Sequence, residues 1–356
     1  MRAWICIAAA AVAISGCNQK SGAPSAGGGL AAPRQQAWAA GSSTVFPFAT
    51  RVAENVARTT GGAAAKVESL GTGGGIKLFC GGAGPAYPDV ANASRPMKKS
   101  EFELCAKNGV DDVVEIKVGF DGIVIANARG GATYDLTLEE IYRGLADELP
   151  AGGAFAKNTA KTWAEVEKTL PADRIQVYGP PPTSGTRDAF VELAMEGGAK
   201  KIPALEALKK SDEEAFKSHT HVIRRDGAWI DAGENDNAIV QTLTKTPGSL
   251  GVFGYSFLEN NAEQVKGASI EGVAPSMATI ADGSYPLSRS LFIYVKKSSI
   301  GVTPGLKEFV EGFVSDAASG KGGYLLTRGL IPLPVDQHEA QKKVAATLPL
   351  MAPPTK

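Results

Sequence analysis

Short runs of hydroxyl side chains are the features of this sequence best suited to chemistry, and the fullest run is Ser184-Gly185-Thr186-Arg187. It follows a strand-like segment, 175–178, and three prolines, 180–182, which end strand pairing because proline has no N–H to donate. Apolar residues at spacings of three and four then predict a helix. Free backbone N–H groups at a helix N-terminus attract anions, and a guanidinium matches phosphate oxygens. Alone, the run would more simply be an ordinary helix N-cap.

Three further segments place serine or threonine between a predicted strand and a predicted helix. Ser42-Ser43-Thr44-Val45 precedes a helix whose first turn holds Pro47. Thr72 lies in Gly71-Thr72-Gly73-Gly74-Gly75, which we expect to be a loop whose glycines let backbone N–H groups approach a ligand. Ser94 and Arg95 lie before Pro96. Four such junctions predict a site for a small tetrahedral oxyanion, since a large apolar ligand needs a mostly apolar pocket.

Composition sets the broad class of the protein. The 356 residues are enough for two ordinary domains or one large one, and 37 basic residues balance 37 acidic residues. No basic excess therefore indicates a nucleic-acid partner.

The N-terminus reads as an export signal. Residues 1–17 combine a positive start, a short apolar run and small residues, and Ile14-Ser15-Gly16-Cys17 resembles a bacterial lipobox, which predicts lipidation at Cys17. An ordinary cleaved signal with an incidental cysteine is the alternative. Residues 18–37 are rich in Ser, Gly, Ala, Pro and Gln and are predicted to be a flexible tether, so the folded part should begin near Trp38.

Export changes how the two cysteines of the globular part are interpreted. Cys80 and Cys105 are 25 positions apart, and in an oxidising compartment two such cysteines are most simply a disulfide. None of the three histidines, at positions 219, 221 and 338, has metal-ligand spacing to either cysteine, so no metal site is expected. His219 and His221 are expected to lie in a polar turn, and Arg224 is expected to be an exposed charged residue.

Taken in order, the four junctions resemble the ligand loops of the phosphate-binding protein of the high-affinity phosphate ABC transporter. The segments 233–238 and 247–255 extend the resemblance, which covers the chain from Trp38 to about Pro334. It implies a type II periplasmic binding-protein fold, in which two α/β lobes joined by two crossing strands close on the ligand. Lobe one is expected at 38–125 and 284–356, and lobe two at 126–283. Residues 113–127 would form one crossing strand, and 290–295 would begin the return.

The resemblance also implies a phosphate site, no cofactor, and a monomer that delivers phosphate to the permease subunits of an importer. The implied ligands are Ser43, Thr44, Val45, Thr72, Ser94, Arg95, Ser184, Gly185, Thr186 and Arg187. Some family members have an aspartate where this chain has Arg95, and an arginine where it has prolines. A carboxylate that accepts the phosphate proton is still needed to exclude sulfate, and we favour Asp236 over Asp188.

Three other functions remain open at this point. The protein could scavenge or sense phosphate without delivering it to a permease. The ligand could be another oxyanion, namely sulfate, molybdate or a phosphonate. Alternatively, the chain could be a secreted phosphatase, or a hydrolase with Ser184 as nucleophile. An enzyme is disfavoured, because the sequence has no Gly-x-Ser-x-Gly elbow and no grouping of carboxylates and histidines that suggests a metal cluster.

Overall fold

The computed structural model describes residues 34–233 and 235–355. The predicted export signal, Cys17 and nearly all of the predicted tether lie outside this part of the chain. Within it, no helix is both long enough and apolar enough to cross a membrane.

Lobe one begins with three parallel strands in the order β2-β1-β3, each followed by a helix. The strands are β1 (Trp38–Gly41), β2 (Lys66–Ser69) and β3 (Val90–Ala93), and the helices are α1 (Phe46–Thr60), α2 (Gly71–Phe79) and α3 (Lys99–Lys107). Because parallel strands end at the same edge of a sheet, the loops that lead into α1, α2 and α3 lie together there. This edge carries three of the four predicted ligand loops.

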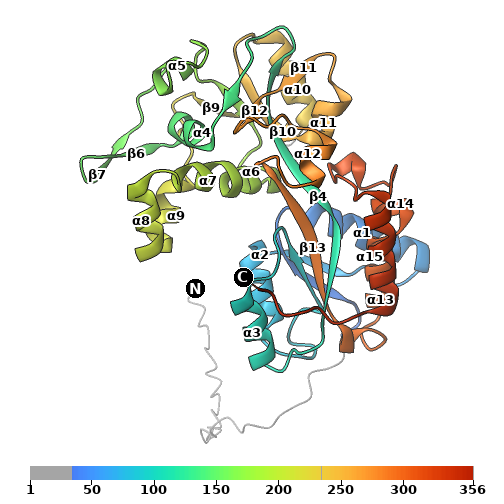
Figure 1. The fold of residues 1–356 in the computed structure, drawn as a ribbon. Helices are drawn as coiled ribbons and strands as arrows, with labels where there is room; N and C mark the ends of the chain where they lie inside the picture. The colour runs from blue at the N-terminus through green and yellow to red at the C-terminus, as the bar shows by residue number, and fades with distance from the viewer. Residues whose placement is uncertain (1–33, 234, 356) are drawn as a thin grey trace, which may run out of the picture. The chain divides into compact units, whose positions relative to one another are not determined.

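Two long strands connect the lobes, as Figure 1 shows. Strand β4 (Val113–Ala128) pairs antiparallel with β13 (Ser288–Lys296) from Val113 to Gly122, with a register shift between Leu291 and Phe292. Strand β13 also pairs with β3, whereas the second part of β4 pairs with β10 (Leu250–Gly254). These strands occupy the positions predicted for the crossing strands, so the expected architecture of two α/β lobes joined by two strands is confirmed.

Lobe two continues the same sheet beyond β4. Strand β10 is followed by the parallel neighbours β8 (Val177–Gly179) and β9 (Trp229–Asp231), while β11 (Val265–Gly267) pairs with β4. Two small sheets are formed by β5 (Asp135–Leu136) with β12 (Ser269–Ile270) and by β6 (Glu148–Ala151) with β7 (Ala154–Lys157). The helices are α4 (Leu138–Leu145), α5 (Trp163–Val166), α6 (Gly185–Phe190), α7 (Glu196–Ala199), α8 (Pro203–Ser211), α9 (Glu213–Thr220), α10 (Asp236–Lys245), α11 (Tyr255–Asn260) and α12 (Met277–Ala281).

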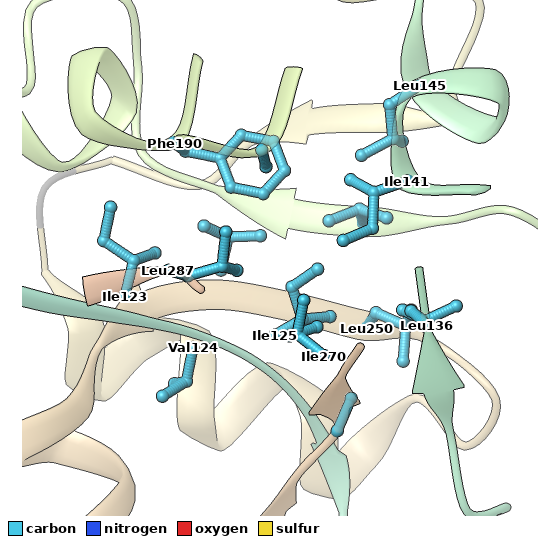
Figure 2. Close-up of a cluster of buried hydrophobic side chains, with 14 of the residues drawn as sticks. Ile123, Val124, Ile125, Leu136, Ile141, Leu145, Phe190, Leu250, Ile270 and Leu287 are labelled. Atoms are coloured by element: carbon cyan, nitrogen blue, oxygen red, sulfur yellow. The ribbon is translucent and has the colours of Figure 1, made fainter. Parts of the chain in front are cut away.

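Each lobe has its own apolar core, and β4 contributes to both. In lobe two, Ile123 and Ile125 of β4 pack among Ile141, Phe190 and Leu250 (Figure 2). In lobe one, Val114, Ile116 and Val118 of β4 join a core that also contains α1 and α13 (Leu306–Phe313), whereas Val113 joins a smaller cluster with α2 and α3.

The chain ends on lobe one. Helix α14 (Asp316–Ser319) leads to α15 (Val335–Thr347), which contacts α13 and β4, and the backbone N–H of Met351 donates to the carbonyl of Val113. The segment after α15 is therefore anchored at the start of β4.

Three expectations are settled by the described residues. Cys80 and Cys105 form the predicted disulfide, which ties the end of α2 to α3. The glycine run is not a loop, because α2 begins at Gly71 and the glycines form its first turns. Arg224 is not exposed charge: only 3% of it is accessible, and its guanidinium donates to the carbonyls of Gly144 and Ala160 and pairs with Asp226.

Candidate functional site

Two helix N-termini from different lobes meet at Thr44 and Gly185. The hydroxyl of Ser43 donates to Asp188 Oδ2 over 2.6 Å, and Thr44 Oγ1 donates to the Gly185 carbonyl over 3.3 Å. A Cβ on Gly185 would lie 2.7 Å from the Ser43 carbonyl oxygen, so only glycine permits this approach. The first and fourth predicted ligand loops are therefore in direct contact.

The local sequence explains how each loop presents its polar groups. Ser184 is the N-cap of α6 and its hydroxyl accepts from the Thr186 N–H over 3.2 Å. Before α1, the Ser42 hydroxyl accepts from the Val45 N–H over 3.4 Å. Thr44 is 6% exposed. The strands ahead of these loops, β8 and β1, fix where the helices begin.

Arg289 joins the two loops and was not predicted as a site residue. It lies on β13, with 9% of its side chain exposed. Its Nη2 donates to Thr44 Oγ1 over 2.6 Å, its Nε to Asp121 Oδ2 over 3.4 Å, and its Nη1 to Glu192 Oε2 over 2.5 Å. The signal in the sequence is an arginine directly before the apolar run of a crossing strand, where a charge needs a partner.

Asp121, on β4, is the buried carboxylate of this group. Burial raises its pKa, while the nearby charge of Arg289 and the hydrogen bond from it act in the opposite direction, and the net result is a raised pKa. A carboxylate with these properties can accept a hydrogen bond from a protonated ligand oxygen.

A cavity of about 300 Å³ brings together five of the predicted ligands. Its lining includes Asp121 and Arg328 together with the predicted residues Thr44, Ser184, Gly185, Thr186 and Asp236. Asp236, the first residue of α10, accepts from the Gly254 N–H over 3.2 Å. Asp236, the predicted proton acceptor, thus lies in the same cavity as the hydroxyls of Thr44, Ser184 and Thr186.

Thr72, Ser94 and Arg95 line a neighbouring cavity of about 630 Å³, which Arg289 also lines. The Thr72 and Ser94 hydroxyls lie 3.0 Å apart, and the Ser94 N–H donates to Thr72 Oγ1 over 3.1 Å. Arg95 makes a two-pronged ion pair with Glu101 over 2.7 and 2.8 Å, and this hydrogen bonding raises the pKa of Arg95. The second and third predicted loops thus meet each other, and Arg289, which lines their cavity, also contacts Thr44.

Arg187 is the predicted ligand that lies apart from the others. Its guanidinium stacks 4.3 Å from the Trp229 ring centre, and its Nη1 donates to the Pro180 carbonyl and to Asp231. It lines a third cavity, of about 240 Å³, together with Asp188, Glu192 and His221. Burial lowers the pKa of Arg187, so a nearby anion would stabilise its charge.

The helix that follows Ser184 contains one irregular segment, Val191–Met195, where it widens into a π-turn between α6 and α7. Glu192, the partner of Arg289, lies in this π-turn. Such turns are often associated with functional sites, and simple periodicity does not reveal them.

The histidines are held by neighbouring side chains. His221 Nε2 lies 2.8 Å from Glu196 Oε1, and His219 stacks on Phe155 with ring centres 3.6 Å apart. His219 lies in α9 and His221 is the C-cap of this helix, so the segment is not the polar turn that was expected there. Across residues 34–233 and 235–355 no cluster of three or more His, Cys, Asp or Glu has the arrangement of a metal site.

Two α/β lobes, a pair of connecting strands and polar loops that meet between the lobes define the class of two-lobed substrate-binding proteins. The family described as PBP superfamily domain matches residues 27–317, and the chain belongs to this family.

Several relatives agree with this assignment. The chain is 32% identical to Protein SphX of Synechocystis sp. over 85% of its own length and 80% of that protein. It is 30% identical to the phosphate-binding protein PstS of Staphylococcus saprophyticus, over 85% of this chain and 82% of that protein. A solved structure described as a possible phosphate binding protein from Planctomyces limnophilus superimposes with a TM-score of 0.70 and 28% identity, covering 89% of this chain and 99% of that one.

Proposed function

We propose that this protein binds inorganic phosphate outside the cytoplasmic membrane and delivers it to an ABC-type phosphate importer. The observation that carries the proposal is the junction at Thr44, where a buried hydroxyl, the N-terminus of α6 and the guanidinium of Arg289 meet between the lobes. Backbone N–H groups, hydroxyls and a guanidinium are the groups that hold a dehydrated phosphate. The names of the PstS relatives and the description of the Planctomyces structure support the same ligand.

The proposed ligand set keeps the hydroxyl and amide ligands inferred from the sequence and adds the guanidinium of Arg289. Arg289 supplies charge at the junction, because it touches Thr44 and lines the cavity that contains Thr72 and Ser94. The hydroxyls and amides come from the loops that precede α1, α2, α3 and α6. Arg187 belongs to the set only if the loop that precedes α6 moves toward the junction when phosphate binds.

A carboxylate on the cavity wall would give selectivity for hydrogen phosphate. Asp236 and Asp121 both line the cavity that contains Thr44. Hydrogen phosphate has a proton to donate to such a carboxylate, whereas sulfate has none and would be repelled. We retain Asp236 as the acceptor and add Asp121 as its rival.

The decisive experiment is a calorimetric titration with phosphate, with sulfate as competitor, on the native protein and on Asp236→Asn and Asp121→Asn. The acceptor variant should lose affinity for phosphate and gain affinity for sulfate, while the other variant should keep its preference. If sulfate competes equally in the native protein, the proposal of phosphate as the specific ligand is wrong and another oxyanion is the ligand. If the protein releases phosphate from a phosphate ester, it is a hydrolase and the proposed binding function is wrong.

The remaining parts of the proposal concern closure and location. We propose that lobe one (38–125 and 284–356) and lobe two (126–283) close about β4 and β13 around the ligand, and that the protein acts as a monomer. The segment 1–17 would direct export, and acyl chains on Cys17 would hold the protein to a membrane through the tether at 18–37. Labelling of cells with a radioactive fatty acid should mark the native protein but not Cys17→Ser.

A further inference from the structure

The cavity lined by Thr72 and Ser94 is much larger than an orthophosphate ion requires. It has a volume of about 630 Å³, and it extends from these hydroxyls and Arg289 to Lys200, Lys209 and Lys217 on the far lobe. One tetrahedral anion bound by Arg289 and the hydroxyls of Thr72 and Ser94 would fill only that end of the cavity. The end lined by the lysines therefore has room for a further occupant.

The charge of the lining indicates what that occupant is. Six basic side chains face four carboxylates, although the chain as a whole is neutral. The basic residues are Arg95, Lys98, Lys200, Lys209, Lys217 and Arg289, and the carboxylates are Glu101, Glu192, Glu196 and Glu213. Each carboxylate already pairs with one of these bases, so the excess positive charge has no counterpart in the lining.

The lysines of lobe two are crowded. Lys200 and Lys209 both approach Glu196 Oε2, over 3.3 and 3.6 Å, and His221 approaches the other oxygen over 2.8 Å. Burial and the nearby Lys200 lower the pKa of Lys209. Two ammonium groups that share one carboxylate would be stabilised by a further anion between the lobes.

The lining also argues against an organic group beside the phosphate. Apart from the glycines of α2, Leu193 is the apolar residue in the lining, no Phe, Tyr or Trp lines it, and the one ring there, His221, is paired with Glu196. A ligand that extends outward from the junction should therefore carry charge along its length.

We propose that this site also takes condensed phosphates, with pyrophosphate as the shortest. One phosphoryl group would be held at the junction by Thr44, Thr72, Ser94 and Arg289, and the next would extend toward the ammonium groups of Lys200 and Lys209. This inference rests on the proposed function, because the first phosphoryl group uses the orthophosphate site.

The test compares orthophosphate with pyrophosphate by calorimetry at low salt, where charge contributes most. The variant Lys200→Gln/Lys209→Gln should weaken pyrophosphate binding about tenfold or more and orthophosphate binding less than about threefold. The matched control is Lys201→Gln/Lys210→Gln, which makes the same change in charge at adjacent positions that do not line the cavity. Lys98→Gln, on the opposite wall, should also weaken pyrophosphate selectively and does not disturb Glu196.

The outcomes are distinguishable. The inference holds if pyrophosphate displaces orthophosphate and depends on the two lysines. It fails if orthophosphate binds and pyrophosphate does not, if both bind at once, or if the lysine variant and its control bind pyrophosphate equally. If orthophosphate itself does not bind, the proposed function fails, whatever pyrophosphate does.

Discussion

Arg289 Nη2 lies 2.6 Å from Thr44 Oγ1, joining the crossing strand β13 to the loop before α1 across 245 positions of sequence. The same guanidinium reaches Asp121 on β4 and Glu192 in the π-turn of lobe two. One side chain thus touches lobe one, lobe two and a connecting strand.

Arg289→Gln should therefore abolish tight phosphate binding. A buried anion without its guanidinium loses roughly 2–5 kcal/mol, which is a factor of about 30 or more in the dissociation constant. Arg187→Gln should have a smaller effect, because Arg187 is occupied by Trp229 and Asp231 in another cavity. Calorimetry on both variants decides between them, with Arg58→Gln on the exposed end of α1 as the control. A larger loss for Arg187→Gln would restore Arg187 as the principal cation.

Gly75→Ala should destabilise lobe one. A Cβ at this position would lie 2.2 Å from the Cα of Gly41, so β1 and α2 would have to separate. Gly74→Ala, one residue earlier in the same helix, is the matched control, because its nearest neighbour would be Leu70 Cβ at 3.6 Å. Thermal unfolding should show a loss for Gly75→Ala and no loss for Gly74→Ala, since alanine favours a helix by up to about 1 kcal/mol. Equal midpoints would contradict the close approach.

Glu196 should contribute stability that depends on pH. Burial alone would raise the pKa of Glu196, but the hydrogen bond from His221 and the charge of Lys200 prevail and lower it to about 2. The folded pKa lies below the unfolded value, so the contribution is present above about pH 5 and is lost as the pH falls through 2. Glu196→Gln should cost about 1–3 kcal/mol at pH 7 by urea unfolding.

The same measurement at pH 3 should show a smaller cost for Glu196→Gln. The exposed pair of Glu206 with Lys210 provides the comparison, and Glu206→Gln should change stability less at either pH. A cost for Glu196→Gln that stays constant from pH 7 to pH 3 would contradict the assignment of the ion pair.

Removal of the Cys80–Cys105 bridge should lower the free energy of unfolding. The bridge closes a segment of 25 positions, for which the loss of chain entropy in the unfolded state is worth about 3 kcal/mol. Cys80→Ala/Cys105→Ala should show this difference in urea, and the reduced native protein should behave like the variant. Identical midpoints for the native and variant proteins under oxidising conditions would contradict a stabilising role.

The sequence predicted the parts of the fold that depend on local pattern. Each of the four hydroxyl loops lies at or shortly before the start of a helix, since the alternation of strand and helix is a pattern over a few positions, and Ser184 also caps its helix. The crossing strand at 113–127 was recognisable because its apolar residues alternate over an unusual length.

What local pattern could not reveal were contacts between distant segments. Arg289 acquires its role from Thr44 and Glu192, which lie far away in the sequence. The buried environment of Arg224 is built by carbonyls at 144 and 160. The start of α2 was missed for a different reason. Glycine weakens a helix, so the glycines at the first turns of α2 favoured the prediction of a loop.

The sixteen residues of β4 have a consequence for how this protein unfolds. One continuous strand supplies hydrogen bonds and apolar side chains to the interiors on either side of the hinge. Unfolding of one core would remove β4 from the other core as well. Heating or denaturant should therefore unfold the described chain in a single cooperative step, with tryptophan fluorescence and circular dichroism changing together.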